Sequence, residues 1–187
     1  MKSIIKSNIL LLIVVLSLSA CEPANREVPL TKVFNTSGIN PLHIRNAAKY
    51  VGYNEKKNRK ELKKLMGIDP VRTEWCAAFI NTVLNLSNIR GSESISDTPL
   101  MARSFLKWGL SVNEPQRGDI VVFERGNSGW QGHVAIYMGT VERNGKFYYR
   151  TLGGNQNNSI NVSEYPVSKL LGIRRIQKIV DVKIALN

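Results

Sequence analysis

Val134-Ala135-Ile136-Tyr137-Met138 is the stretch that decides the fold of the C-terminal half. Its length and its β-branched and aromatic residues predict a buried strand. Upstream, Asp119-Ile120-Val121-Val122-Phe123 predicts a second strand, and downstream Arg143-Asn144-Gly145 is a strong hairpin-turn signal. The chain is therefore expected to return antiparallel to this strand. Three further strands are expected over residues 146–150, 159–162 and 172–176.

The preceding part of the chain has helical periodicity. Apolar residues recur at helical spacing from Leu42 to Val51, which predicts a first helix. Thr98 followed by Pro99 is typical of a helix start, and Gly109 is a plausible end. Two helices are expected in between, over residues 59–66 and from about residue 73 to 84. Helices followed by a meandering antiparallel sheet of about five strands indicate an α+β fold.

The N-terminus resembles an export signal. Lys2 and Lys6 precede an unbroken apolar run over residues 9–16, which is shorter than the roughly 20 residues that a membrane-spanning helix needs. The run ends in Leu18-Ser19-Ala20-Cys21, which resembles a lipobox, the bacterial motif whose cysteine receives a diacylglycerol. The alternative is an ordinary secretory signal in which the cysteine stands by chance.

These features predict three segments and a location. We expect residues 1–20 to be a lipoprotein signal peptide and residues 21–40 a lipidated Cys21 and a flexible tether. Residues 41–187 are expected to form one domain, long enough to bury a hydrophobic core. The protein would then be a membrane-anchored lipoprotein outside the cytoplasm. Glu22 favours the periplasmic face of the outer membrane if the host is Gram-negative.

The charge of the chain points to anionic partners. Lys and Arg number 26 against 14 acidic residues, a formal net charge of +12. Such a balance favours nucleic acid, anionic lipid or anionic cell-wall polymers, and export argues against nucleic acid. The densest basic run, residues 56–60, is interpreted as a solvated helix face. No ligand cluster for a metal or cofactor is apparent, and the protein is expected to be a monomer.

Cys76 is the first candidate for chemistry. The chain has two cysteines, and if Cys21 is lipidated, Cys76 has no partner, which favours a reactive thiol over a buried, inert one. Cys76 is expected in the first turn of a helix that opens at Trp75. Unpaired N–H groups and the helix dipole there would favour a thiolate and could bind an oxyanion.

Of the two histidines, His133 is the credible partner for a cysteine nucleophile. It opens the strand described first and follows Gly132, which allows a close backbone approach, whereas His43 has no chemical context and is expected at the surface. An amide could orient the His133 ring. A three-residue hairpin loop would set Asn155 opposite His133, and a two-residue loop would set Gln156 there. We expect Asn155, with Gln156 as the alternative.

Five motifs in order resemble one family. They are Trp75-Cys76-Ala77-Ala78-Phe79, residues 102–109, Gly118-Asp119-Ile120-Val121-Val122-Phe123, Gly132-His133-Val134-Ala135 and Leu152-Gly153-Gly154-Asn155-Gln156. Together they resemble the CHAP group (cysteine, histidine-dependent amidohydrolases/peptidases) and its NlpC-type relatives. This resemblance covers roughly residues 41–176 and implies a papain-like fold.

The resemblance also implies a reaction. Cys76 would be the nucleophile, His133 the general base and then acid, and Asn155 the orienting group, although many CHAP enzymes have an acidic residue near that third position. Trp75, Trp130 and Gln156 would be candidates for the cleft or oxyanion site. The implied activity is hydrolysis of a peptidoglycan amide bond through an acyl-enzyme, by an N-acetylmuramoyl-L-alanine amidase or a stem-peptide or cross-bridge endopeptidase. The alternatives are a non-catalytic wall-binding lipoprotein and a lipid-directed thiol acyltransferase.

Overall fold

The computed structural model describes residues 40–177. The predicted signal peptide, the lipidation site Cys21 and nearly all of the predicted tether lie outside these residues. Within residues 40–177, no helix has the length and apolar character needed to cross a membrane.

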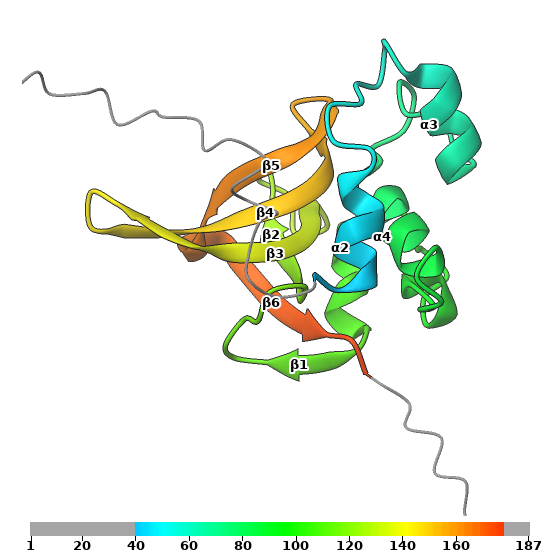
Figure 1. Cartoon of the computed structure of the whole chain (residues 1–187). Helices are drawn as coiled ribbons and strands as arrows, with labels where there is room; N and C mark the ends of the chain where they lie inside the picture. The colour runs from blue at the N-terminus through cyan, green and yellow to red at the C-terminus, as the bar shows by residue number, and fades with distance from the viewer. Residues whose placement is uncertain (1–39, 178–187) are drawn as a thin grey trace, which may run out of the picture.

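The architecture is α+β, as expected, with the helices gathered on one side of an antiparallel sheet (Figure 1). The sheet has six strands in the order β1-β6-β2-β3-β4-β5. The strands are β1 Leu110–Val112, β2 Ile120–Glu124, β3 Gly132–Arg143, β4 Lys146–Gln156, β5 Ser159–Pro166 and β6 Leu170–Arg175. The α-helices are α2 Leu42–Ala48, α3 Arg59–Met66 and α4 Cys76–Asn85, and the 3-10 helices are η1 Ser92–Ser94, η2 Ala102–Lys107 and η3 Val167–Lys169.

Several expected elements differ from those observed. The short strand β1 was not expected, and it raises the sheet from about five strands to six. The helix expected to start at Pro99 is the 3-10 helix η2, which begins only at Ala102. His43 was expected at the surface but is buried, because its Nε2 bonds the carbonyl oxygen of Gly118 at 2.8 Å and ties α2 to the turn before β2.

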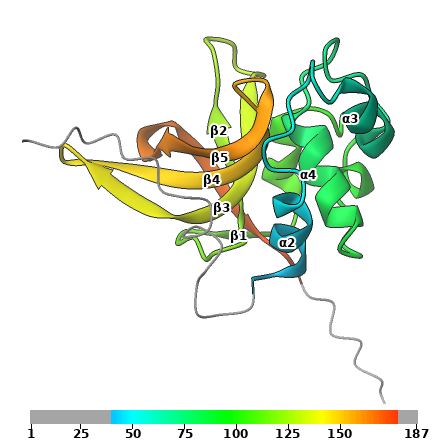
Figure 2. The same cartoon turned by 45° about the horizontal axis from the view of Figure 1, so that its top comes forward.

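Both faces of the sheet are covered. Ile120 and Val122 of β2 pack into the core beneath the helices, whereas Val121 and Phe123 point into a second, smaller cluster on the other face. A strand buried on both faces reads as a continuous apolar run, which is why residues 120–123 lack the alternation of a half-exposed strand. Figure 2 shows β3, β4 and β5 side by side, with α2, α3 and α4 together on the other side of the view.

The β3–β4 hairpin corrects the loop prediction. Arg143 pairs with Lys146, so the loop is the two-residue Asn144-Gly145, with φ values of 51° and 71° that suit such a turn. The expected three-residue loop is therefore wrong. A register shift between Tyr137 and Gly139 then moves the pairing by one residue, so that Ile136 lies opposite Leu152. The turn alone does not set which residue faces His133.

Candidate active site

Cys76 is the first residue of α4, at the place in the helix that the sequence predicted. Its side chain is only 4% exposed. Burial raises the pKa of the Cys76 thiol, and the backbone amide of Val134 and the charge of Arg125 only partly oppose this. The resting group is therefore a thiol rather than the thiolate expected from the helix N-terminus, because burial outweighs the local dipoles. Because Val134 directly follows His133 in the chain, this contact of its amide places the Cys76 sulfur near His133.

His133, at the beginning of β3, is completely buried. Burial lowers the pKa of His133 to about 4, although a hydrogen bond to Gln156 opposes the shift. The ring Nε2 lies 3.2 Å from Gln156 Oε1. The other ring nitrogen, Nδ1, is buried and has no hydrogen-bond partner among residues 40–177. A buried nitrogen of this kind is unusual and is expected where a proton is to be accepted.

The Gln156 amide determines the tautomer of His133. Its Nε2 donates to the backbone oxygen of Asn161 at 2.7 Å and to Asn161 Oδ1 at 2.9 Å. The Gln156 Oε1 is therefore the acceptor, and it also receives the Thr151 hydroxyl at 3.1 Å. The imidazole must then carry its proton on Nε2, which leaves the lone pair on Nδ1. The neutral ring is in the form of a general base.

Asn155 faces elsewhere. Its Nδ2 donates to Glu74 Oε2 at 2.6 Å, and its backbone is left-handed, with φ 56°. The ladder between β4 and β5 is irregular between Gly153 and Gln156, and this irregularity turns Gln156 toward the imidazole. The expected contact between Asn155 and His133 is thus replaced by a contact from Gln156, which was the alternative.

The two glycines before Asn155 lie where neighbouring side chains come close to the β4 backbone. A Cβ atom on Gly154 would lie 2.6 Å from the Trp75 ring and 2.7 Å from Phe79 Cβ. A Cβ atom on Gly153 would lie 3.1 Å from Gln156 Oε1. Gly154 therefore allows β4 to lie against the start of α4, and Gly153 leaves room for the amide that bonds His133.

Neither tryptophan named as a cleft candidate lies at the imidazole. Trp75 is completely buried in the core, and its Nε1 donates to Glu55 Oε2 at 3.3 Å. Trp130 lies in the loop before β3 and is 63% exposed. Trp75 helps to hold the start of α4, and Trp130 extends into solvent.

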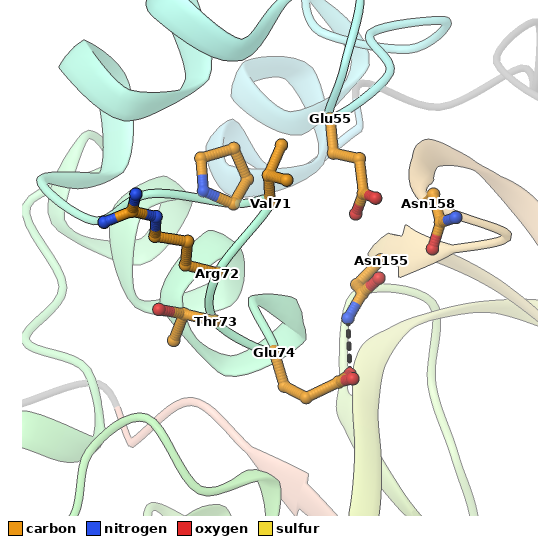
Figure 3. Close-up of a pocket in the computed structure, with 8 residues that line it drawn as sticks. Glu55, Val71, Arg72, Thr73, Glu74, Asn155 and Asn158 are labelled. Atoms are coloured by element: carbon orange, nitrogen blue, oxygen red, sulfur yellow. Dashed lines mark hydrogen bonds between the residues drawn. The ribbon is translucent and has the colours of Figure 1, made fainter.

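A polar pocket of about 250 Å³ adjoins this site (Figure 3). It is lined by Glu55, Asn155, Asn158 and residues 70–74. Glu74, two residues before Cys76, closes one side, and its Oε2 also lies 3.5 Å from Arg125 Nη1. Glu74 thus joins Arg125, the residue after β2, to Asn155 near the end of β4. Sequence analysis missed Glu74 and Arg125, because their roles arise only where these segments meet.

Tyr165 of β5 was also missed, since the strand was expected to end at residue 162. Its ring stacks on the His133 imidazole with centroids 4.7 Å apart and an interplanar angle of 16°. It also stacks on Phe123, at 5.1 Å and 24°. A buried thiol, a neutral imidazole with a free Nδ1, an orienting amide and a stacked aromatic ring together form a site suited to nucleophilic catalysis.

Residues 68–155 match the family model of the CHAP domain. This part of the chain is therefore similar to CHAP domains, and the α+β architecture is consistent with the papain-like superfamily. CHAP domains are generally hydrolases, of the amidase or peptidase type. The matched range includes Cys76 and His133 and ends at Asn155, one residue before Gln156. No curated protein matches the chain.

Proposed function

We propose that this protein is a cysteine hydrolase that cleaves an amide bond of peptidoglycan through an acyl-enzyme. The observation that carries the proposal is the buried, unpartnered Nδ1 of His133. The next residue in the chain, Val134, donates its backbone amide to the Cys76 sulfur, so the imidazole and the thiol lie near each other. An imidazole held as the Nε2–H tautomer can take the thiol proton on Nδ1. A structural histidine would be expected to have both nitrogens satisfied.

The acylation step follows from these groups. The thiol proton moves to His133 Nδ1 as the sulfur attacks the amide carbonyl carbon and forms the C–S bond. The carbonyl oxygen becomes an oxyanion, which backbone N–H groups at the start of α4 are suited to bind. When the tetrahedral adduct collapses, the C–N bond breaks, and the leaving nitrogen takes the proton from Nδ1. A thioester on Cys76 and a free amine result.

Hydrolysis of the thioester uses the same groups. A water molecule gives a proton to His133 Nδ1 while its oxygen attacks the thioester carbonyl. The C–S bond then breaks, the sulfur recovers the proton, and a carboxylic acid leaves. Because Cys76 has a raised pKa and His133 a lowered one, the resting pair is neutral, and the ion pair forms only during the reaction.

The surroundings of Cys76 favour a peptide over a lipid substrate. The adjoining pocket is lined mainly by carboxylate, amide and hydroxyl side chains, which can hydrogen-bond a peptide. A thiol acyltransferase would need a wide apolar cleft at the nucleophile. Neither cavity is lined by Cys76 or His133 themselves, but the polar pocket includes Glu74, two residues before Cys76, whereas the larger, more apolar groove is lined by residues such as Leu42, Ile95 and Trp108.

Digestion of purified peptidoglycan, followed by mass spectrometry of the released fragments, tests the proposal. An amidase would separate intact stem peptides from glycan, whereas an endopeptidase would release shortened peptides or cut cross-links. Cys76→Ala is the matched control and should release nothing. If wild-type protein binds peptidoglycan but releases no fragments, the protein is a binding module, and transfer of an acyl group from phospholipid would identify an acyltransferase.

We further propose that the protein is attached to a membrane by a lipid on Cys21. The support is the lipobox-like ending of the apolar N-terminal segment. The tether to residue 40 would have an end-to-end distance of roughly 25 Å as a flexible coil, which would hold the catalytic domain near the wall. Cys21→Ala should move the protein from the detergent phase to the aqueous phase. Equal partitioning of the two forms would exclude the anchor.

A further inference from the structure

The His133 imidazole is held by one hydrogen bond and one flat contact. The hydrogen bond joins Nε2 to Gln156 at 3.2 Å, and the flat contact is the Tyr165 ring, nearly parallel to the imidazole at 4.7 Å. A hydrogen bond at a single ring atom leaves the plane of the ring free to turn about that bond. The Tyr165 ring removes this freedom because it covers one face of the imidazole.

The position of Tyr165 depends on the curvature of the sheet. β5 is separated from β3 by β4, so a flat sheet would keep the two strands apart. Phe123 lies directly across from His133 on β2, and Tyr165 stacks on both rings. Tyr165 is therefore held against His133 by its second stacking contact, with the buried Phe123 ring. A ring held in this way can keep the plane of the imidazole fixed.

We propose that Tyr165 is a positioning residue for the proposed hydrolysis: its ring holds the plane of the His133 imidazole, which keeps the Nε2 hydrogen bond to Gln156, and with it the single tautomer, and leaves Nδ1 available to Cys76. The face of a neutral phenol also attracts a cation, so the ring would stabilise the imidazolium that forms during the reaction. Burial raises the pKa of Tyr165 to about 12, and the phenol therefore stays neutral at working pH. The aromatic face, and not the hydroxyl, carries this role.

Two substitutions separate the ring from the hydroxyl. Tyr165→Phe keeps the stacked face, and its kcat should stay within about 3-fold of wild type, whereas Tyr165→Leu should lower kcat by about 10-fold or more with KM changed far less. Tyr165→Met, which fills more of the space, is the second variant if the leucine protein is poorly folded. Tyr149→Leu is the matched control, because Tyr149 belongs to the same cluster and its ring contacts are to Phe123 and Tyr137.

A second readout does not depend on hydrolysis. Nitrogen NMR of labelled histidine reports the tautomer, and the chain has only two histidines. His133 should be a single Nε2–H tautomer in wild type, Tyr165→Phe and Tyr149→Leu, and a mixture in Tyr165→Leu. An unchanged tautomer and kcat in Tyr165→Leu would overturn the proposal, as would a Tyr165→Phe protein as impaired as Tyr165→Leu.

This inference rests on the proposed function, but the two can fail separately. A wild-type protein that releases no peptidoglycan fragments would refute the hydrolase proposal, and the tautomer measurement would still decide whether Tyr165 positions the ring. An active wild-type protein with an unaffected Tyr165→Leu variant would refute only the role of Tyr165.

Discussion

The two buried histidines, His43 in α2 and His133 at the start of β3, differ in what surrounds the ring. His43 bonds the Gly118 carbonyl and borders an apolar groove of about 1110 Å³. His133 bonds Gln156, has a free Nδ1 and lies near a pocket of only about 250 Å³. Burial lowers the pKa of both histidines. Burial and the direction of the pKa shift are common to both histidines, and the larger cavity lies beside His43. The feature that marks His133 as the catalytic histidine is a buried, unpartnered ring nitrogen near a thiol.

Exchange of each histidine for alanine tests this comparison most strongly. His133→Ala should reduce fragment release from peptidoglycan by at least about 10³-fold, because both proton transfers pass through its ring. His43→Ala should keep most of the activity and lose about 1 kcal/mol of stability, since it breaks one hydrogen bond to the backbone. The measurements are a digestion assay and urea unfolding. A fully active His133→Ala protein would contradict the catalytic assignment.

The two amides near the site offer a finer test. Gln156→Ala should lower kcat by about 10²-fold, because the imidazole loses the acceptor that determines its tautomer. Asn155→Ala should change kcat by no more than about 3-fold, since its amide bonds Glu74 at the rim. Parallel kinetics of the two variants decide between them. A crippled Asn155→Ala enzyme beside a normal Gln156→Ala enzyme would restore the original expectation from the three-residue loop.

Acid stability tests the feature that the two histidines share. Both have folded-state pKa values below the ordinary value of 6.5, so the unfolded chain binds protons first as the pH falls. The free energy of unfolding should therefore decrease between pH 6.5 and pH 4.5, by about 2 kcal/mol for His133. Urea unfolding of wild type and His133→Gln over this range should show a smaller decrease in the variant. Equal decreases would mean that His133 is not buried in its neutral form.

The hairpin shows why part of the site was beyond sequence reasoning. Asn144-Gly145 predicts a turn because its residues tolerate positive φ, and this preference is local. The register at His133 depends also on the shift between Tyr137 and Gly139 and on the irregularity between Gly153 and Gln156. No local signal distinguished the two amides, because a one-residue shift exchanges the residues that face the imidazole.

The amino-acid sequence by itself determined the α+β class, the place of Cys76 at a helix start and that of His133 at a strand start. These features depend on periodicity and backbone preferences over a few neighbouring residues. Only the tertiary structure decided that Gln156 bonds His133, that Tyr165 stacks on it and that burial keeps the thiol protonated. These depend on sheet curvature and exclusion of water, which arise from contacts between segments far apart in the chain.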